Sequence, residues 1–154
     1  MPYLSCPQGV DNVHSIEEVQ GTQLNEVYIG SCTNGSLEDM AVAARILQGH
    51  HVAPYLKFII IPASIGIYRQ CMRLGYIRAF VEAGAMVAHP CCGLCCGQPY
   101  GLMSDGEVVL GTNNRNFIGR MGTTKSLIFL SSPATAAASA LTGVITDPRT
   151  VTAD

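Results

Sequence analysis

The chain has 154 residues, 48% of them hydrophobic and 13% charged, and carries a formal net charge of −2 at pH 7. A chain of this length is about one domain and can bury a hydrophobic core of its own. Because the net charge is slightly negative and no run of Lys or Arg occurs, the basic footprint of a protein that binds nucleic acid or an anionic membrane surface is excluded.

Short apolar runs and amphipathic stretches alternate along the chain. In chain order they predict a strand at 25–30, a helix at 36–47, a strand at 57–62, helices at 64–74 and 76–82, strands at 85–89, 108–110 and 127–130, and a helix at 134–141. We expect residues 1–21 to form an irregular lead-in and residues 149–154 a tail. The alternation predicts a single α/β domain over residues 1–154, with three layers (α/β/α) and a mostly parallel sheet.

Cysteines are concentrated in two segments. Four of the seven lie in residues 91–97, Cys-Cys-Gly-Leu-Cys-Cys-Gly, and Cys32 lies in the sequence Ser-Cys-Thr-Asn-Gly. Seven cysteines fit a disulfide framework poorly, and the adjacent Cys91 and Cys92 would form a strained ring. Metal-bound thiolates between glycines are the simpler interpretation. No export signal or membrane-length apolar run is visible, so we expect a cytoplasmic, reducing environment.

The spacing of Cys92 and Cys95 is C-x-x-C, which lets two thiolates bind one metal centre. The spacing alone does not identify the metal, because zinc sites and redox disulfides share it. A zinc site formed by His89 with Cys32, Cys92 and Cys95 is one alternative. A thioredoxin-like redox pair would begin a helix, and the glycines of the cluster together with Pro99 argue against that helix.

A polar segment at 111–120 follows the predicted strand 108–110, just as both cysteine segments follow predicted strands. Ligands of parallel sheets bind beyond the carboxyl ends of the strands, so we expect one shared site. The segment contains Arg115 and Arg120. Because a guanidinium binds a carboxylate through two parallel hydrogen bonds, the pair indicates a dicarboxylate substrate. The alternative interpretation is a solvated loop with surface arginines.

Three motifs together resemble the aconitase superfamily, in particular large subunits of the 3-isopropylmalate dehydratase and homoaconitase type. These motifs are residues 31–35, 92–95 and 114–122, in the order of that family and with about its separations; residues 132–148 are similar to the family's final stretch. The resemblance covers nearly the whole chain. It implies a hydro-lyase that moves the hydroxyl of a 2-hydroxy di- or tricarboxylate to the adjacent carbon, in amino-acid biosynthesis such as that of leucine.

The resemblance also implies a cofactor. The three cluster ligands of the family fall on Cys32, Cys92 and Cys95, which would hold three irons of a [4Fe–4S] cluster. The fourth iron would bind the substrate and polarise its C–OH bond. Cys91 and Cys96 depart from the family's pattern, and we interpret them as inert. If either were a fourth ligand, the open iron would be closed, and electron transfer or sensing would be favoured over catalysis.

Three polar residues match functional positions of the family. Asn114 matches an asparagine beside the cluster, and Arg115 and Arg120 match arginines that bind substrate carboxylates. The resemblance therefore implies Asn114 and Arg120 as catalytic residues and all three as substrate-binding residues. It also implies a small, swivelling subunit and two earlier lobes as partners, and neither lobe is in this sequence. Two alternative functions are an iron–sulfur module without enzymatic activity and an interaction fragment without metal.

Overall fold

The computed structural model describes residues 1–151 and contains one seven-stranded sheet in the order β2-β1-β7-β6-β3-β4-β5. The strands are Tyr3–Ser5 (β1), Val13–Ser15 (β2), Glu26–Gly30 (β3), Lys57–Ile61 (β4), Met86–Val87 (β5), Val108–Gly111 (β6) and Leu127–Leu130 (β7). The α-helices are Ile16–Val19 (α1), Leu37–Leu47 (α2), Ile65–Arg73 (α3), Tyr76–Ala83 (α4) and Pro133–Thr142 (α5). Two 3₁₀ turns are Gly93–Cys96 (η1) and Pro148–Thr150 (η2).

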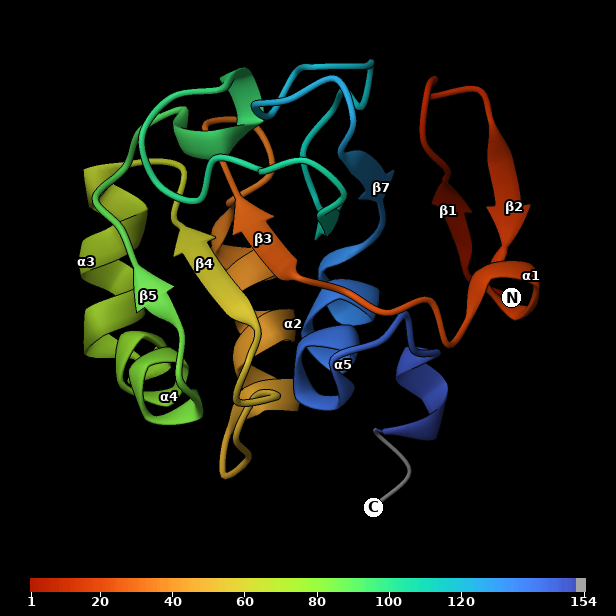
Figure 1. The fold of residues 1–154 in the computed structure, drawn as a ribbon. Coiled ribbons are helices and arrows are strands. Elements are labelled where there is room, and N and C mark those ends of the chain that lie inside the picture. The colour runs from red at the N-terminus through yellow and green to blue at the C-terminus, as the bar shows by residue number, and fades with distance from the viewer. Residues whose placement is uncertain (152–154) are drawn as a thin grey trace.

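Strands β3 to β7 run parallel to one another, and β3, the middle one of these five, pairs with β4 on one side and β6 on the other. The α/β fold with a mostly parallel sheet is therefore confirmed. Because these strands share a direction, their carboxyl ends meet at one edge of the sheet. The loops that follow β3, β5 and β6 gather there, at the top of Figure 1.

The predicted helices are confirmed, and three of them have a serine as the N-cap residue. Ser36, Ser64 and Ser132 each accept a hydrogen bond from the backbone N–H three residues later, as N-cap residues do. Gly84 and Gly143, in the left-handed conformation, end α4 and α5. In residues 1–151 no helix combines the length and apolar character that crossing a lipid bilayer requires.

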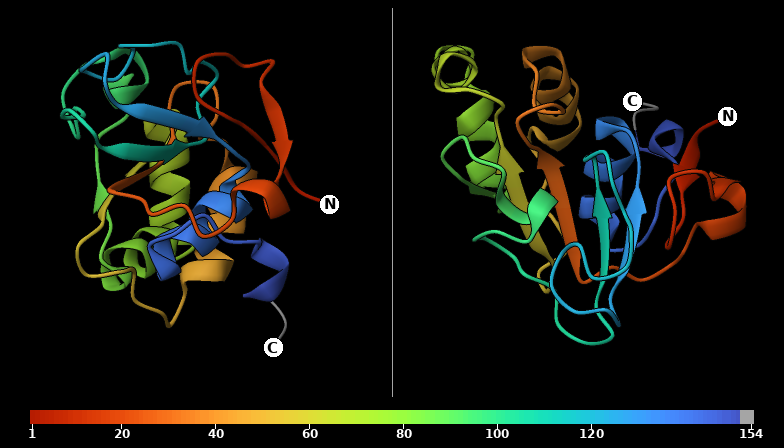
Figure 2. Two further views of the ribbon diagram at one scale, coloured as in Figure 1. Left: turned by 45° about the vertical axis from the view of Figure 1, so that its right-hand side comes forward. Right: turned by 90° about the horizontal axis from the view of Figure 1, so that it is seen from above.

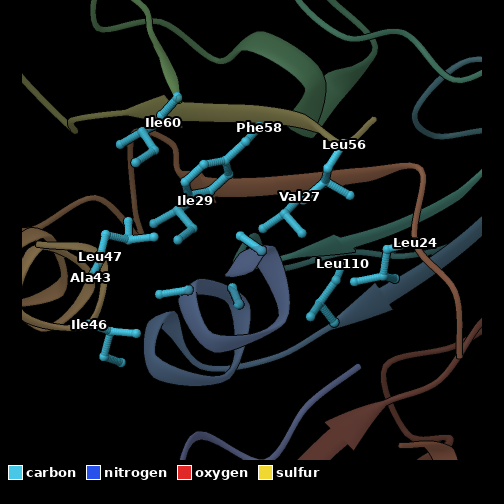
Figure 3. Packing of buried hydrophobic residues seen from close by; sticks show 14 of the residues in the cluster. Leu24, Val27, Ile29, Ala43, Ile46, Leu47, Leu56, Phe58, Ile60 and Leu110 are labelled. Carbon is cyan, nitrogen blue, oxygen red and sulfur yellow. The ribbon is translucent and has the colours of Figure 1, made fainter. Parts of the chain in front are cut away.

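The two faces of the sheet are covered differently. Val27 and Ile29 of β3 point to one face, where Ala43 and Leu47 of α2 and the helix α5 lie nearby (Figure 3). Cys71 of α3 and Phe80 of α4 belong to the same hydrophobic cluster. Tyr28 of β3 points to the other face, which is covered by η1 and by the loops around Met103 and Met121. Seen from above in Figure 2, the helices lie on one side of the sheet and these loops on the other. Of the three expected layers, the third is therefore formed by loops and a 3₁₀ turn.

The expected irregular lead-in at residues 1–21 is wrong. Strands β1 and β2 pair antiparallel, α1 follows them, and Ser5 of β1 pairs with Leu130 of β7, which extends the sheet. The buried Asn116 fixes this hairpin, since its Nδ2 donates to the carbonyl of Cys6 at 2.7 Å.

The strand expected at 85–89 is limited to Met86–Val87. After β5 the chain turns towards the cysteines at Pro90, which has no N–H to continue the ladder. The expected tail begins with the 3₁₀ turn η2, and residues 152–154 lie outside the described part of the chain.

Candidate metal and substrate site

The first cysteine segment leaves β3 through a tight crossing. Gly30 and Ser31 both have φ of 110°, and a Cβ on Gly30 would overlap the carbonyl oxygen of Ile61 in β4. Only glycine fits at that position. Ser31 is fully buried and holds a conformation that is unfavourable for a residue with a Cβ, while its N–H donates to the Ile61 carbonyl at 3.1 Å. This crossing places the exposed Cys32 at the carboxyl edge of the sheet.

The second cysteine segment is the 3₁₀ turn η1, which is anchored by its apolar residue. Leu94 is fully buried against the sheet, and the hydroxyl of Tyr28 in β3 donates to the carbonyl of Cys92 at 3.0 Å. Gly97 ends the turn in the left-handed conformation. Leu94 and Tyr28 therefore hold the backbone, while Cys92 remains exposed and Cys95 half-buried.

Tyr28 is a donor that the sequence analysis missed. It is fully buried, and burial raises the pKa of its phenol, with a further contribution from the neighbouring thiols of Cys95, Cys91 and Cys92. The hydroxyl therefore keeps its proton and continues to donate to the Cys92 carbonyl. The period-two pattern of β3 places Tyr28 on a buried face, but its partner is 64 residues away in the sequence and no local pattern indicates it.

The polar loop after β6 is bonded to the first cysteine segment. Asn114 donates through Nδ2 to the Thr33 hydroxyl at 2.9 Å and accepts from Nδ2 of Asn34 at 2.6 Å. Asn34 also donates to the carbonyl of Thr112, and the Thr112 hydroxyl accepts from the Gly30 N–H at 2.9 Å. The predicted residue Asn114 thus lies beside the loop of Cys32, and Thr112 is a second positioning residue that the sequence analysis missed.

The two predicted arginines differ in their surroundings. Arg120 places Nη2 3.9 Å from Sγ of Cys95 and its guanidinium carbon 5.0 Å from the centre of the Phe117 ring. Its Nε is buried and has no hydrogen-bond partner in the described residues. Arg115 is exposed, and among residues 1–151 no ion pair engages its guanidinium. Arg120 therefore contacts the cysteine turn, whereas the exposed guanidinium of Arg115 is accessible to a ligand.

A groove of about 380 Å³ runs beside the cysteine turn. It is lined by His89, Pro90, Cys91, Cys92, Gly93, Gln98, Pro99 and Tyr100. Within residues 1–151 no group of three or more His, Cys, Asp and Glu side chains is close enough to hold a metal ion. The alternative zinc ligands, which are His89, Cys32, Cys92 and Cys95, therefore do not form such a group.

The polar loop therefore joins the two cysteine segments, through Asn114 on one side and Arg120 on the other. The other two asparagines of this loop are structural. Asn113 is buried and donates to the carbonyl of Arg115 at 2.7 Å, and Asn116 holds the N-terminal hairpin. Cys71 of α3 is fully buried in the core, and Cys91 and Cys96 are exposed on the turn.

Comparison with known proteins gives a consistent assignment. The sequence model of the family described as "Aconitase family (aconitate hydratase)" matches residues 8–143 of this chain. The chain is 56% identical over 149 residues to "3-isopropylmalate dehydratase large subunit 2" of Archaeoglobus fulgidus, and the match covers 97% of this chain and 36% of that protein. It is 51% identical to the "Probable 3-isopropylmalate dehydratase large subunit" of Methanosarcina mazei, with the same coverage. The large subunit of Nitratidesulfovibrio vulgaris is 49% identical, again over 97% of this chain and 36% of the relative. The chain thus spans about a third of the length of these relatives.

Proposed function

The chain belongs to the aconitase family, and from this premise we propose that it is the cluster-bearing part of a hydro-lyase of the 3-isopropylmalate dehydratase type. The reaction removes a hydroxyl and a hydrogen from adjacent carbons as water, and adds water back with the hydroxyl on the neighbouring carbon. The observation that carries the proposal is the polar loop that links the Cys32 segment to Cys95 at one edge of the sheet.

The donor set fits a [4Fe–4S] cluster. Cys32 and Cys92 are unpaired and exposed, and Cys95 is unpaired and half-buried. Because a cubane is wider than a single ion, thiolates that hold one do not need to converge on one point. The buried Nε of Arg120 lacks an acceptor, which a cluster sulfur or a substrate carboxylate would supply. When bound, the cluster supplies Lewis-acid chemistry at its open iron.

The polar loop supplies the substrate contacts in this proposal. The exposed guanidinium of Arg115 has donors available for a carboxylate of the substrate, with two parallel hydrogen bonds. Asn114 keeps the polar loop against the Cys32 segment, through Thr33 and Asn34, and so holds both in register with the substrate. Arg120 is the second candidate for substrate binding and catalysis.

The relatives' length supports a proposal about partners, because the match covers 36% of the Archaeoglobus fulgidus relative. We propose that the rest of a large subunit and a separate small subunit complete the active site, and that the substrate is a 2-hydroxy di- or tricarboxylate. The names of the relatives support 3-isopropylmalate and hence a step of leucine biosynthesis. Exposed, unpaired thiols support a reducing, cytoplasmic location.

The proposal is tested by adding substrate to the chain after anaerobic reconstitution with iron and sulfide and mixing with the companion polypeptides. We expect 3-isopropylmalate to change the electron paramagnetic resonance spectrum of the reduced cluster, because its hydroxyl and carboxylate bind iron directly. Arg115→Gln should weaken this response, and Arg69→Gln, a change on the exposed surface of α3, should not. A spectrum that responds to no 2-hydroxy di- or tricarboxylate would contradict the proposal.

An iron–sulfur module without hydro-lyase activity is the second candidate, and the exposure of Cys91 and Cys96 on the same turn favours it. A fourth thiolate from either residue would close the cluster to substrate. Iron and sulfide contents of Cys91→Ser and Cys96→Ser decide between the two. If both variants keep the full cluster content, the four-thiolate module is ruled out.

A further inference from the structure

Arg120 contacts the cysteine turn through both its backbone and its side chain. Nη2 lies 3.9 Å from Sγ of Cys95, within reach of a hydrogen bond to sulfur. The carbonyl oxygen of Arg120 packs against Gly97, where an added Cβ would be only 3.0 Å from it. Gly97 ends the turn that begins at Cys92. Arg120 therefore contacts this turn at two places, at the thiol of Cys95 and at Gly97.

Phe117 restricts the direction of this guanidinium. The N–H of Arg120 donates to the carbonyl of Phe117 at 3.2 Å, and the turn that this bond closes brings the guanidinium over the ring at 5.0 Å. A cation above an aromatic face is attracted by the ring's quadrupole. Phe117 is half exposed, so its ring contributes to this contact rather than to the core.

The contact distinguishes Arg120 from Arg115, although only four residues of one loop separate them. Arg115 is exposed and suited to a mobile carboxylate, whereas Arg120 is half-buried and its Nε has no solvent contact. A planar guanidinium held by a ring and a turn loses little further freedom when it donates to an anion. Such a donor fits the fixed Cys95 thiolate through Nη2, and its Nε remains available to a substrate carboxylate.

We propose that Arg120 is a positioning residue for the Cys95 thiolate, and that it stabilises the reduced form of the cluster by donating to Sγ. This inference rests on the proposed function, because it assigns a partner to one thiolate of that cluster. Reduction adds negative charge to a cluster, and hydrogen bonds to its sulfurs raise its reduction potential. Arg120 would therefore raise the potential and slow the loss of iron.

The test compares the reduction potential and iron retention of the reconstituted 154-residue chain with those of four variants. We expect Arg120→Gln to have a more negative potential and to lose iron to a chelator about ten times faster, which is the usual size of outer-shell effects. Arg120→Lys keeps the charge and should fall between Arg120→Gln and the unchanged chain. Phe117→Leu removes the ring and should shift the potential in the same direction by less.

Arg115→Gln is the matched control, since it removes the same charge from the same loop without a contact to Cys95, and it should shift the potential less than Arg120→Gln does. If Arg120→Gln has the potential of the unchanged chain, or if Arg115→Gln shifts the potential as much, this inference is wrong while the proposed function stands. If the unchanged chain takes up no iron, both are wrong. Should Arg120→Gln fail to fold, Arg120→Lys and Phe117→Leu give the same comparison.

Discussion

The two faces of the sheet perform different tasks. The helical face is covered by four helices, and its buried residues are almost all aliphatic or aromatic. The loop face is covered by irregular chain, and it buries Tyr28 and Glu26 in addition to apolar residues. Tyr28 holds the cysteine turn. The comparison indicates that the helical face supplies most of the stability, while the loop face positions the reactive side chains and tolerates unfavourable groups.

Glu26 is the clearest unfavourable group. It lies at the amino end of β3, with no solvent exposure, and Gly101 of the covering loop packs closely against its carboxyl. The ammonium of Lys57 is 3.3 Å away and is shared with Glu107 at 3.0 Å. Burial raises the pKa of Glu26 to about 8, and the attraction of Lys57 only partly opposes this. The carboxyl is therefore largely protonated at pH 7.

The largest expected effect is on the helical face. Phe80 of α4 is fully buried in the core of that face, so Phe80→Ala should lower the free energy of unfolding by about 3–5 kcal/mol. Chemical denaturation measures the change. The neighbouring Val81 is 57% exposed, and Val81→Ala should cost less than about 0.5 kcal/mol. Equal losses in the two variants would mean that the helical face is not the main source of stability.

The next effect is on the loop face and depends on pH. Because the folded chain holds the proton of Glu26 more tightly than the unfolded chain does, its contribution to stability is complete below the ordinary pKa of 4.5 and is lost as the pH rises to about 8. Across that interval the free energy of unfolding should fall as the pH rises, by at most about 1.4 kcal/mol per pH unit from this group. Glu26→Gln should remove this slope in denaturation measured between pH 5 and 8.

Asp105→Asn is the control for this experiment. Hydrogen bonds from Lys125 and Thr123 lower the pKa of Asp105, so its stabilising contribution is lost only as the pH falls below the ordinary range. The slope between pH 5 and 8 should be the same in Asp105→Asn and the unchanged chain. If Glu26→Gln also keeps the slope, Glu26 is ionised in the fold and the account of the loop face is wrong on this point.

The smallest expected effect is at the cysteine turn. Tyr28→Phe removes the hydroxyl that donates to the Cys92 carbonyl at 3.0 Å, and it should cost about 1 kcal/mol of stability. It should also increase the rate at which Cys92 is alkylated, measured by mass spectrometry, because the turn is held less firmly. Tyr55→Phe removes a similar bond, to the Gly143 carbonyl at 3.2 Å, from a half-exposed side chain. A faster reaction of Cys92 in Tyr55→Phe would contradict the specific role of Tyr28.

The helical face was largely predictable from sequence, and the loop face was not. Serine caps and apolar spacing define α2, α3 and α5 within short stretches of chain, so local patterns are sufficient. The N-terminal hairpin was missed because its β1 and β2 are three residues long and depend on a bond from Asn116, more than a hundred residues away. Residues 97–107 and 112–122 show no regular spacing of apolar residues, and contacts with segments far away in the sequence fix their positions, such as the bond from the Met103 N–H to the Met121 carbonyl.

The same distinction applies to the candidate site. Asn114 and Arg120 could be selected from sequence because a family motif contains them, and each lies beside one cysteine segment. Their partners Thr33 and Cys95 follow from the meeting of strand ends at one edge. The roles of Tyr28 and Thr112 depend on contacts with segments far away in the sequence, and that of Phe117 depends on the conformation of its own loop. Residue type and spacing encode neither.

We propose that Cys32 and the turn of Cys92 and Cys95 hold one cluster, and iron and sulfide content is the measurement that decides it. The unchanged chain and single serine variants of the cysteines would be reconstituted anaerobically and analysed per mole of protein. Cys32→Ser should lose the cluster as completely as Cys92→Ser and Cys95→Ser do, while Cys96→Ser on the same turn keeps it. If Cys32→Ser retains full iron and sulfide, Cys32 does not share a cluster with Cys92 and Cys95.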